Sequence, residues 1–129
     1  MPRTALYFYK AANGEVPVLA WLRDLRRTNR RAYARCVAAV QELGARGHEL
    51  RRPLADYLQD GVYELRTRVG RENYRVLYFF HGRNVAILTH ALTKEAAILR
   101  SDLTRALSRK AAFEADPAAH TYEEELPNG

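Results

Sequence analysis

Cationic, imidazole and phenol side chains gather in one segment of the chain, between residues 62 and 94. The set consists of Arg66, Arg68, Arg75, Tyr78, His81, His90 and Lys94. Guanidinium groups can hold a phosphodiester and stabilise the extra negative charge of a pentacoordinate phosphate transition state. Imidazole and ammonium groups can take the 2′-hydroxyl proton and protonate the leaving 5′-oxygen, as metal-free RNA cleavage requires. These residue types favour phosphodiester chemistry.

Three runs rich in Val, Tyr, Phe, Ile and Leu carry these side chains and predict a three-stranded antiparallel meander. The runs are VYELRTRV, NYRVLYFF and NVAILTHAL, separated by short turns at GREN and HGR. Alternation places Arg66 and Arg68 on one face of the first strand and Arg75 on one face of the second. If these faces match across the hairpin, the three arginines converge. His90 and Lys94 then lie at the end of the third strand and in the following turn.

The same residues also fit ordinary structural roles. Arginines on a strand commonly face solvent or pair with an acid such as Glu64, and His90 fits a packed position under the last helix. Tyr78, between Leu77 and Phe79, fits the core as well as a site. The functional interpretation depends on the clustering of these residues in one segment.

Motifs of metal-dependent and acyl-transfer enzymes are missing from the sequence. It has no glycine-rich phosphate loop, no HExxH, no DxD pair and no recognisable nucleophile elbow. The single cysteine, Cys36, excludes an internal disulfide and a cysteine-based zinc cluster, which fits the reducing cytosol. We therefore expect no metal and no cofactor. No stretch approaches the ~18 apolar residues of a membrane span, so we expect a cytoplasmic protein without membrane contact.

The charge is distributed unevenly along the 129 residues. The chain carries 21 basic and 15 acidic side chains, a net charge of +6, but residues 1–110 carry all 21 basic and only 10 acidic ones, or +11. Such a field attracts polyanions, with nucleic acid first among them. We expect one domain over residues 1–115 and an acidic, flexible tail over residues 116–129. That Glu123–Glu125 fold back onto the basic body is a separate hypothesis.

The N-terminal part predicts one strand and a helical hairpin. The aromatic run TALYFYK, residues 4–10, is typical of a strand. Apolar residues at helical spacing predict a helix over residues 17–27. A second helix can be capped by Thr28 or Asn29 and is stopped by Gly47.

The rest of the chain completes an α+β order of β-α-α-β-β-β-α. Residues 50–61 are polar and interrupted by Pro53, so they predict no regular element. An Ala-rich amphipathic stretch predicts the last helix over residues 94–114, before Pro117. The helices are then expected to lie together on the covering side of a small antiparallel sheet.

Five stretches together resemble a known family. They are YELR at residues 63–66, YRVLYFF at 74–80, THALTK at 89–94, RAL at 105–107 and GEVPVLAWLRDL at 14–25. They resemble the RelE/ParE superfamily of type II toxins, and specifically its phage-derived HigB-like branch. The resemblance covers about residues 5–115. It implies the small RelE-like fold, an antiparallel β-sheet core with two N-terminal helices and a C-terminal helix.

The resemblance implies the toxin of a toxin–antitoxin system, whose RNase members cleave mRNA in the ribosomal A site without metal. Arg66 matches the arginine of the ELR motif, Arg75 that of the YR motif, and Lys94 the first lysine of a K-K pair. Together with His90, these are the expected catalytic residues. The expected RNA-binding residues are Arg68, Arg71, Tyr78 and Arg83. The implied partners are mRNA on the ribosome and a cognate antitoxin, in this branch often a helix-turn-helix protein.

Two other functions stay open. One is non-hydrolytic inhibition, as in ParE-type relatives that poison DNA gyrase. The other is a catalytically degenerate, phage-derived nucleic-acid-binding relative, favoured by Glu64 and Glu95, which stand where relatives carry lysines. His90 and Lys94 favour RNA cleavage, because a gyrase binder has no need of proton-transfer groups.

Overall fold

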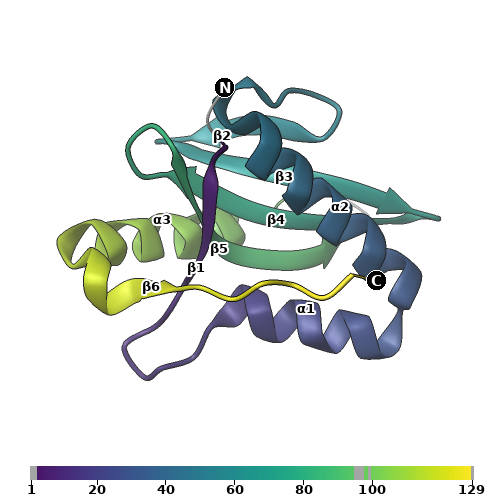
Figure 1. The fold of residues 1–129 in the computed structure, drawn as a ribbon, viewed down its shortest axis with the longest axis horizontal. Coiled ribbons are helices and arrows are strands. Elements are labelled where there is room, and N and C mark those ends of the chain that lie inside the picture. Colours follow the sequence, from purple (N-terminus) through teal and green to yellow (C-terminus); the bar gives the residue numbers. More distant parts are fainter. Residues whose placement is uncertain (1–2, 95–97, 99, 129) are drawn as a thin grey trace.

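Three α-helices pack against a six-stranded sheet in the part of the chain described by the structure, a computed structural model covering residues 3–94, 98 and 100–128 (Figure 1). The strands are β1 (Ala5–Tyr9), β2 (Ala55–Gln59), β3 (Val62–Val69), β4 (Glu72–Phe80), β5 (Val85–Lys94) and β6 (Thr121–Tyr122). The helices are α1 (Pro17–Thr28), α2 (Arg30–Arg46) and α3 (Arg100–Ala115). The strands follow the order β2-β3-β4-β5-β1-β6, and all neighbours are antiparallel except β1 and β5. The expected α+β class is confirmed.

The ends of α1 and α2 lie at the residues that the sequence predicted for them. Pro17 occupies the first turn of α1, where a missing N–H costs no hydrogen bond. Asn29 separates the two helices, and its side-chain oxygen accepts a hydrogen bond from the Ala32 N–H at 3.1 Å. Gly47 follows α2 with φ of 53° and ψ of −123°, a backbone conformation that L side chains avoid. These residues fix both the length of the hairpin and the angle at which the chain leaves it.

Gly47→Ala is expected to lower the free energy of unfolding by about 2–4 kcal/mol, because strain and overpacking add. The positive φ is strained for alanine, and the added Cβ would collide with Oγ1 of Thr4, next to β1. Gly70→Ala is the matched control, since Gly70 also has a positive φ but has open space around it, so it should lose only about 1–2 kcal/mol. Urea unfolding of both variants measures the difference. Equal losses would contradict the close approach of Gly47 to Thr4.

Three parts of the chain differ from expectation. Residues 121–122, expected to lie in a flexible tail, form β6 against β1. Residues 50–61, expected to be irregular, contain the edge strand β2. Asp60 and Gly61, both at positive φ (49° and 84°), join β2 to β3 in the conformation that tight hairpins favour, so the Asp-Gly pair was the missed signal. The last helix was expected from Lys94, but this residue ends β5 and α3 begins at Arg100.

Helices cover both faces of the sheet, so the expectation that they lie together on one covering side was wrong. Helices α1 and α2 cover one face, and the core there includes Leu22, Tyr33, Val37, Leu43, Leu65, Val76, Tyr78 and Leu88. Helix α3 packs on the opposite face, which we call the α3 face, through two smaller clusters that include Phe79, Ile87 and Phe113, and Leu77, Leu92 and Ala106. Strand alternation therefore decides which side chains of β3, β4 and β5 lie beneath α3.

Candidate functional site

The strand register brings three of the predicted catalytic residues to the α3 face. Arg66 of β3 lies directly opposite Arg75 of β4, as the alternation of the two strands predicted. On the other side of β4, Leu77 lies opposite His90 of β5, and Leu92 lies opposite Arg75. His90 is therefore a diagonal neighbour of Arg75 on the same face. The remaining predicted catalytic residue, Lys94, is paired with Asn73 through its backbone, but its side chain and Glu95 lie outside the described part of the chain.

Arg75 forms a buried ion pair with Glu64. Its Nη1 atom lies 3.0 Å and 2.8 Å from the two carboxylate oxygens of Glu64, and the residues are only 7% and 3% exposed. Arg66 Nη1 lies 3.6 Å from the same carboxylate, but its side chain is more than one third exposed. The structural role weighed for a strand arginine, pairing with Glu64, is thus realised for Arg75. Glu64 offsets positive charge at the place where a phosphate would bind.

His90 is held by a carboxylate of α3. Its Nε2 atom lies 2.9 Å from Oδ1 of Asp102, and His90 is only 8% exposed. Burial lowers the pKa of His90 below its ordinary value; Asp102 opposes this shift, while the positive charges of Arg109 and Arg105 add to it. The imidazole is therefore neutral at neutral pH. With an N–H donated to Asp102, the ring presents the lone pair of Nδ1 as a proton acceptor.

This shift predicts that stability falls in mildly acidic solution. Because the pKa of His90 is lower in the folded than in the unfolded chain, the unfolded chain binds more protons as the pH falls below about 6.5. The free energy of unfolding should decrease from there until the pH reaches the folded pKa, and then level off with respect to this group. His90→Gln should remove this part of the pH dependence, which urea unfolding between pH 5 and pH 8 can measure. An unchanged slope in the variant would contradict the burial of a neutral His90.

Helix α3 contributes polar residues that the sequence interpretation missed. Asp102 binds His90, and Arg109 donates a hydrogen bond from Nη1 to the backbone oxygen of Thr89 at 2.5 Å. The guanidinium of Arg109 also lies 5.7 Å from the ring centre of Tyr9, and burial lowers its pKa. Residues 102, 105 and 109 recur with helical spacing, which predicts a common face of the helix. That spacing was a usable signal, because the apolar residues of α3 already indicated which side faces the sheet.

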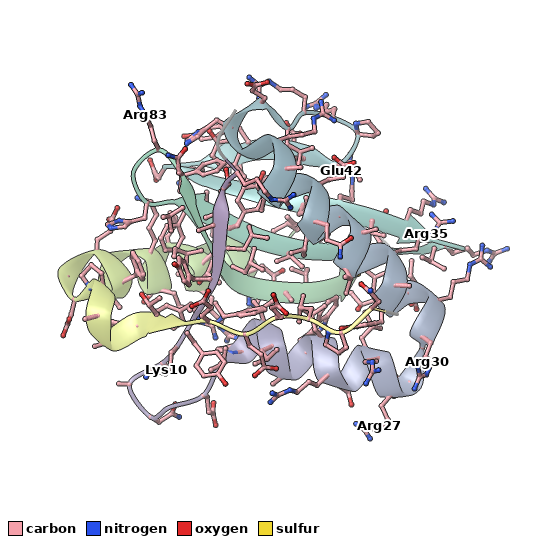
Figure 2. All side chains as sticks on the ribbon, viewed as in Figure 1. Lys10, Arg27, Arg30, Arg35, Glu42 and Arg83 are labelled. Atoms are coloured by element: carbon pink, nitrogen blue, oxygen red, sulfur yellow. The ribbon has the colours of Figure 1, made fainter. Side chains whose placement is uncertain are left out.

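The predicted RNA-binding residues do not lie together. Arg68, Arg71 and Arg83 are exposed, and Figure 2 shows Arg83 projecting from the turn between β4 and β5. Arg68 donates a hydrogen bond from Nε to the backbone oxygen of Gly70 at 3.1 Å, within the β3–β4 turn. These arginines are accessible to a polyanion, but they extend from opposite ends of β4.

Tyr78 does not offer a surface to RNA. It is 1% exposed and belongs to the core under α1 and α2, on the face opposite to Arg75 and His90. Its ring stacks on Tyr63, with centroids 5.4 Å apart, and burial raises the pKa of its phenol well above the usual range. The structure therefore places Tyr78 in the core, the other role that its apolar neighbours in the sequence allowed.

The described residues hold no group of three or more His, Cys, Asp or Glu side chains that could bind a metal ion. No helix among them has the length and apolar character needed to cross a membrane. What the α3 face offers is a neutral imidazole held by a carboxylate and close to the charges of Arg105 and Arg109, with Arg75 and Arg66 on the neighbouring strands of the same face. Such a set can accept a proton and attract a phosphate.

The architecture is compatible with the small fold of RelE-like proteins. Residues 20–111 match the model of the phage-derived Gp49-like protein family (DUF891), and since the match covers more than two thirds of the 129 residues, the chain belongs to that family. The family is part of the RelE/ParE-like toxin superfamily, and membership is consistent with the toxin of a toxin–antitoxin system. No curated protein matches the chain. The superfamily inferred from the sequence is confirmed.

Proposed function

We propose that this protein is a HigB-like toxin that cleaves mRNA on the ribosome without a metal ion. Membership of the Gp49-like family supports a toxin. The observation that carries the proposal of cleavage is the His90–Asp102 pair at 2.9 Å on a face rich in arginine. Cleavage of RNA needs a proton acceptor of this kind, whereas binding alone does not require one.

In the proposed reaction, Nδ1 of His90 accepts the proton of a ribose 2′-hydroxyl group. The 2′-oxygen then attacks the adjacent phosphorus, and the bond from phosphorus to the 5′-oxygen breaks, leaving a 2′,3′-cyclic phosphate and a protonated 5′-hydroxyl group. Arg66 and Arg75 stabilise the additional negative charge on the phosphate. Lys94, assigned from the sequence, is the proposed donor of the proton to the leaving 5′-oxygen.

The proposal includes two partners and a compartment. Exposed arginines such as Arg68, Arg71 and Arg83 support binding to ribosome-bound mRNA through phosphate contacts. A toxin of this kind requires a cognate antitoxin, proposed to be a helix-turn-helix protein. Because ribosomes and mRNA are its targets, the protein is proposed to act in the cytoplasm.

One observation favours a second function, inhibition without RNA cleavage. The carboxylate of Glu64 binds Arg75 at 2.8 Å and lies near Arg66, so the proposed phosphate site contains a negative charge. That charge disfavours a pentacoordinate phosphate. A non-hydrolytic ParE-like gyrase inhibitor, or a degenerate nucleic-acid-binding relative, would tolerate it.

Expression of the chain alone in a bacterial host, followed by primer extension on translated mRNAs, tests the proposal. Growth arrest with new 5′ ends in translated messages is the expected result. Growth arrest with intact mRNA and trapped DNA breaks would overturn cleavage in favour of gyrase inhibition. Normal growth of cells that contain the folded protein would instead favour the degenerate relative.

A further inference from the structure

The C-terminal segment folds back across the molecule and lies on the side opposite to α3. Its strand β6 pairs with β1, Tyr122 opposite Phe8 and Thr121 opposite Tyr9. His120 fixes the base of the segment, since its ring stacks on Tyr9 with centroids 5.2 Å apart and its Nδ1 atom lies 2.7 Å from the backbone oxygen of Lys10. In Figure 1 the segment crosses β1 and then runs between α1 and α2. We call residues 121–128 the strap, and the surface beneath it, formed by β1, α1 and α2, the trough.

The strap follows the alternation of an extended strand. Tyr122, Glu124 and Leu126 are partly buried, whereas the residues between them are exposed. Glu124 accepts two hydrogen bonds from Nη2 of Arg23, at 2.9 Å and 2.8 Å. Leu126 packs against the core under α1 and α2. The trough thus selects an aromatic residue, an acid and a leucine at every second position.

A backbone contact completes this arrangement. The hydroxyl group of Tyr33, in α2, donates a hydrogen bond to the backbone oxygen of Pro127 at 2.6 Å. A carbonyl acceptor in register with alternating side chains is the property of an extended polypeptide. Nucleic acid offers neither this carbonyl nor the apolar side chain that fills the position of Leu126.

The strap does not fill the trough. A cavity of about 390 Å³ remains beside it, lined by Leu19, Leu22, Tyr33 and the arginines at the α1–α2 corner. A second cavity of about 460 Å³ lies on its other side, lined by apolar residues that include Leu6, Phe8, Val37, Val40 and Leu88. A longer or bulkier segment than the strap therefore has room to bind.

The trough carries more positive charges than the strap pairs with. Of the four arginines that line the first cavity, Arg23 pairs with Glu124 and Arg27 pairs with Asp24 of its own helix. Arg26 and Arg30 have no ion pair among the residues that the structure describes, and Figure 2 shows Arg27 and Arg30 projecting where α1 meets α2. Additional carboxylates on a bound segment would find partners there.

We propose that the trough is a docking site for an extended acidic segment of a second protein, and that the strap is its internal competitor. The partner carries an aromatic residue, an acid and a leucine at alternate positions, followed by further acids that reach Arg26 and Arg30. The ion pair between Glu124 and Arg23 is exposed and contributes little, and the pairing of β6 with β1 spans only two residues, so a segment that makes the same contacts and adds further charge contacts competes with the strap. The partner we propose is the antitoxin, and this choice rests on the proposed function. Docking itself does not require RNA cleavage.

A labelled peptide tests the docking on the full chain. The probe is a fluorescein-labelled peptide with the sequence of residues 120–128, HTYEEELPN, and its binding is followed by fluorescence anisotropy. Glu124→Gln in the protein weakens the strap, so the probe should bind this variant about fivefold more tightly than the unaltered chain. Glu123→Gln is the matched control, because it makes the same change in charge at the exposed neighbouring position, and it should leave the affinity unchanged. Equal affinities for the two variants would overturn the competition.

A second probe examines the unused arginines. The peptide HTYEEELPNDD adds two aspartates, which should tighten binding about threefold in the Glu124→Gln background, and Arg30→Ala should cancel the gain. Excess unlabelled peptide should also speed amide hydrogen exchange in residues 122–126 of the unaltered chain. Unchanged exchange would show that the strap is not displaced.

The remaining outcomes distinguish failure of the docking proposal from failure of the proposed toxin function. Displacement of the peptide by a ten-nucleotide single-stranded RNA bound at the same arginines would overturn the peptide site in favour of an RNA surface. Peptide binding by a chain that neither arrests growth nor cleaves mRNA would overturn the proposed function alone. Cleavage by a chain that binds neither peptide would overturn the docking site alone.

Discussion

Glu64→Ala is expected to lower the free energy of unfolding by about 3–5 kcal/mol, because it removes one partner of a buried ion pair. The carboxylate of Glu64 accepts hydrogen bonds from Nη1 of Arg75 at 2.8 Å and 3.0 Å, and both side chains are almost fully buried. Without the carboxylate, the guanidinium of Arg75 stays buried with less compensating charge. Urea unfolding at pH 7 measures the loss.

Two further variants test whether the loss of stability arises from the burial of the ion pair. Arg66→Ala removes the more exposed arginine, 3.6 Å from the same carboxylate, and should cost no more than about 1 kcal/mol. The double variant Glu64→Leu/Arg75→Met replaces the pair by apolar side chains and should recover a large part of the loss. A loss below about 1 kcal/mol for Glu64→Ala would mean that water reaches the pair in solution.

The ion pair also changes how the site can be tested. Arg75→Ala is the variant that the sequence alone suggests for abolishing growth arrest. In this fold, however, it removes the ion-pair partner of the buried Glu64 carboxylate and so destabilises the protein. Loss of toxicity in Arg75→Ala would therefore not separate chemistry from folding. Arg75→Lys keeps the charge next to Glu64 while losing the planar geometry of the guanidinium, so it is the better probe of a phosphate contact.

The sequence predicted well those features that follow from local rules. Alternation along β3 and β4 was sufficient to place Arg66 and Arg75 on one face, because a strand has a fixed period of two. The α1–α2 hairpin followed from Asn29 and Gly47, whose roles depend only on the adjacent backbone. Membership of the RelE/ParE-like superfamily was also recognised, since its motifs are short runs on these same elements.

Features that depend on distant segments could not be obtained in this way. Alternation placed Glu64 beside the arginines but did not decide between a solvent-facing side chain and a buried pair, because that depends on how α3 covers the sheet. The spacing along α3 indicated that Asp102 faces the sheet, but the contact between Asp102 and His90 also depends on where α3 lies along β5, and no local pattern fixes that position. The acidity of residues 123–125 suggested that they fold onto the basic body, and Glu124 does bind Arg23 there, but the trough that receives it is formed by β1, α1 and α2 together and could not be seen in the sequence.

His90→Gln is expected to abolish growth arrest and to reduce mRNA cleavage by about 10²–10⁴-fold, the range typical of a lost general base. Glutamine can still donate a hydrogen bond to Asp102, so the contact between β5 and α3 is kept while the proton acceptor is lost. Primer extension on translated messages measures the cleavage, and urea unfolding confirms that the variant is folded. Arg83→Ala is the control, since Arg83 projects from a turn away from His90 and should change cleavage less than about tenfold.

Asp102→Asn separates proton transfer from packing, because it changes the charge of the carboxylate and little of its shape. Asp102 holds the pKa of His90 higher than burial alone would, so its loss should lower that pKa further. The imidazole would then stay unprotonated at lower pH, and the acidic limb of the pH profile for cleavage should move toward lower pH. A purely structural Asp102 would lower the rate equally at every pH. Full cleavage activity in His90→Gln would remove His90 from the reaction and overturn its assignment as the base.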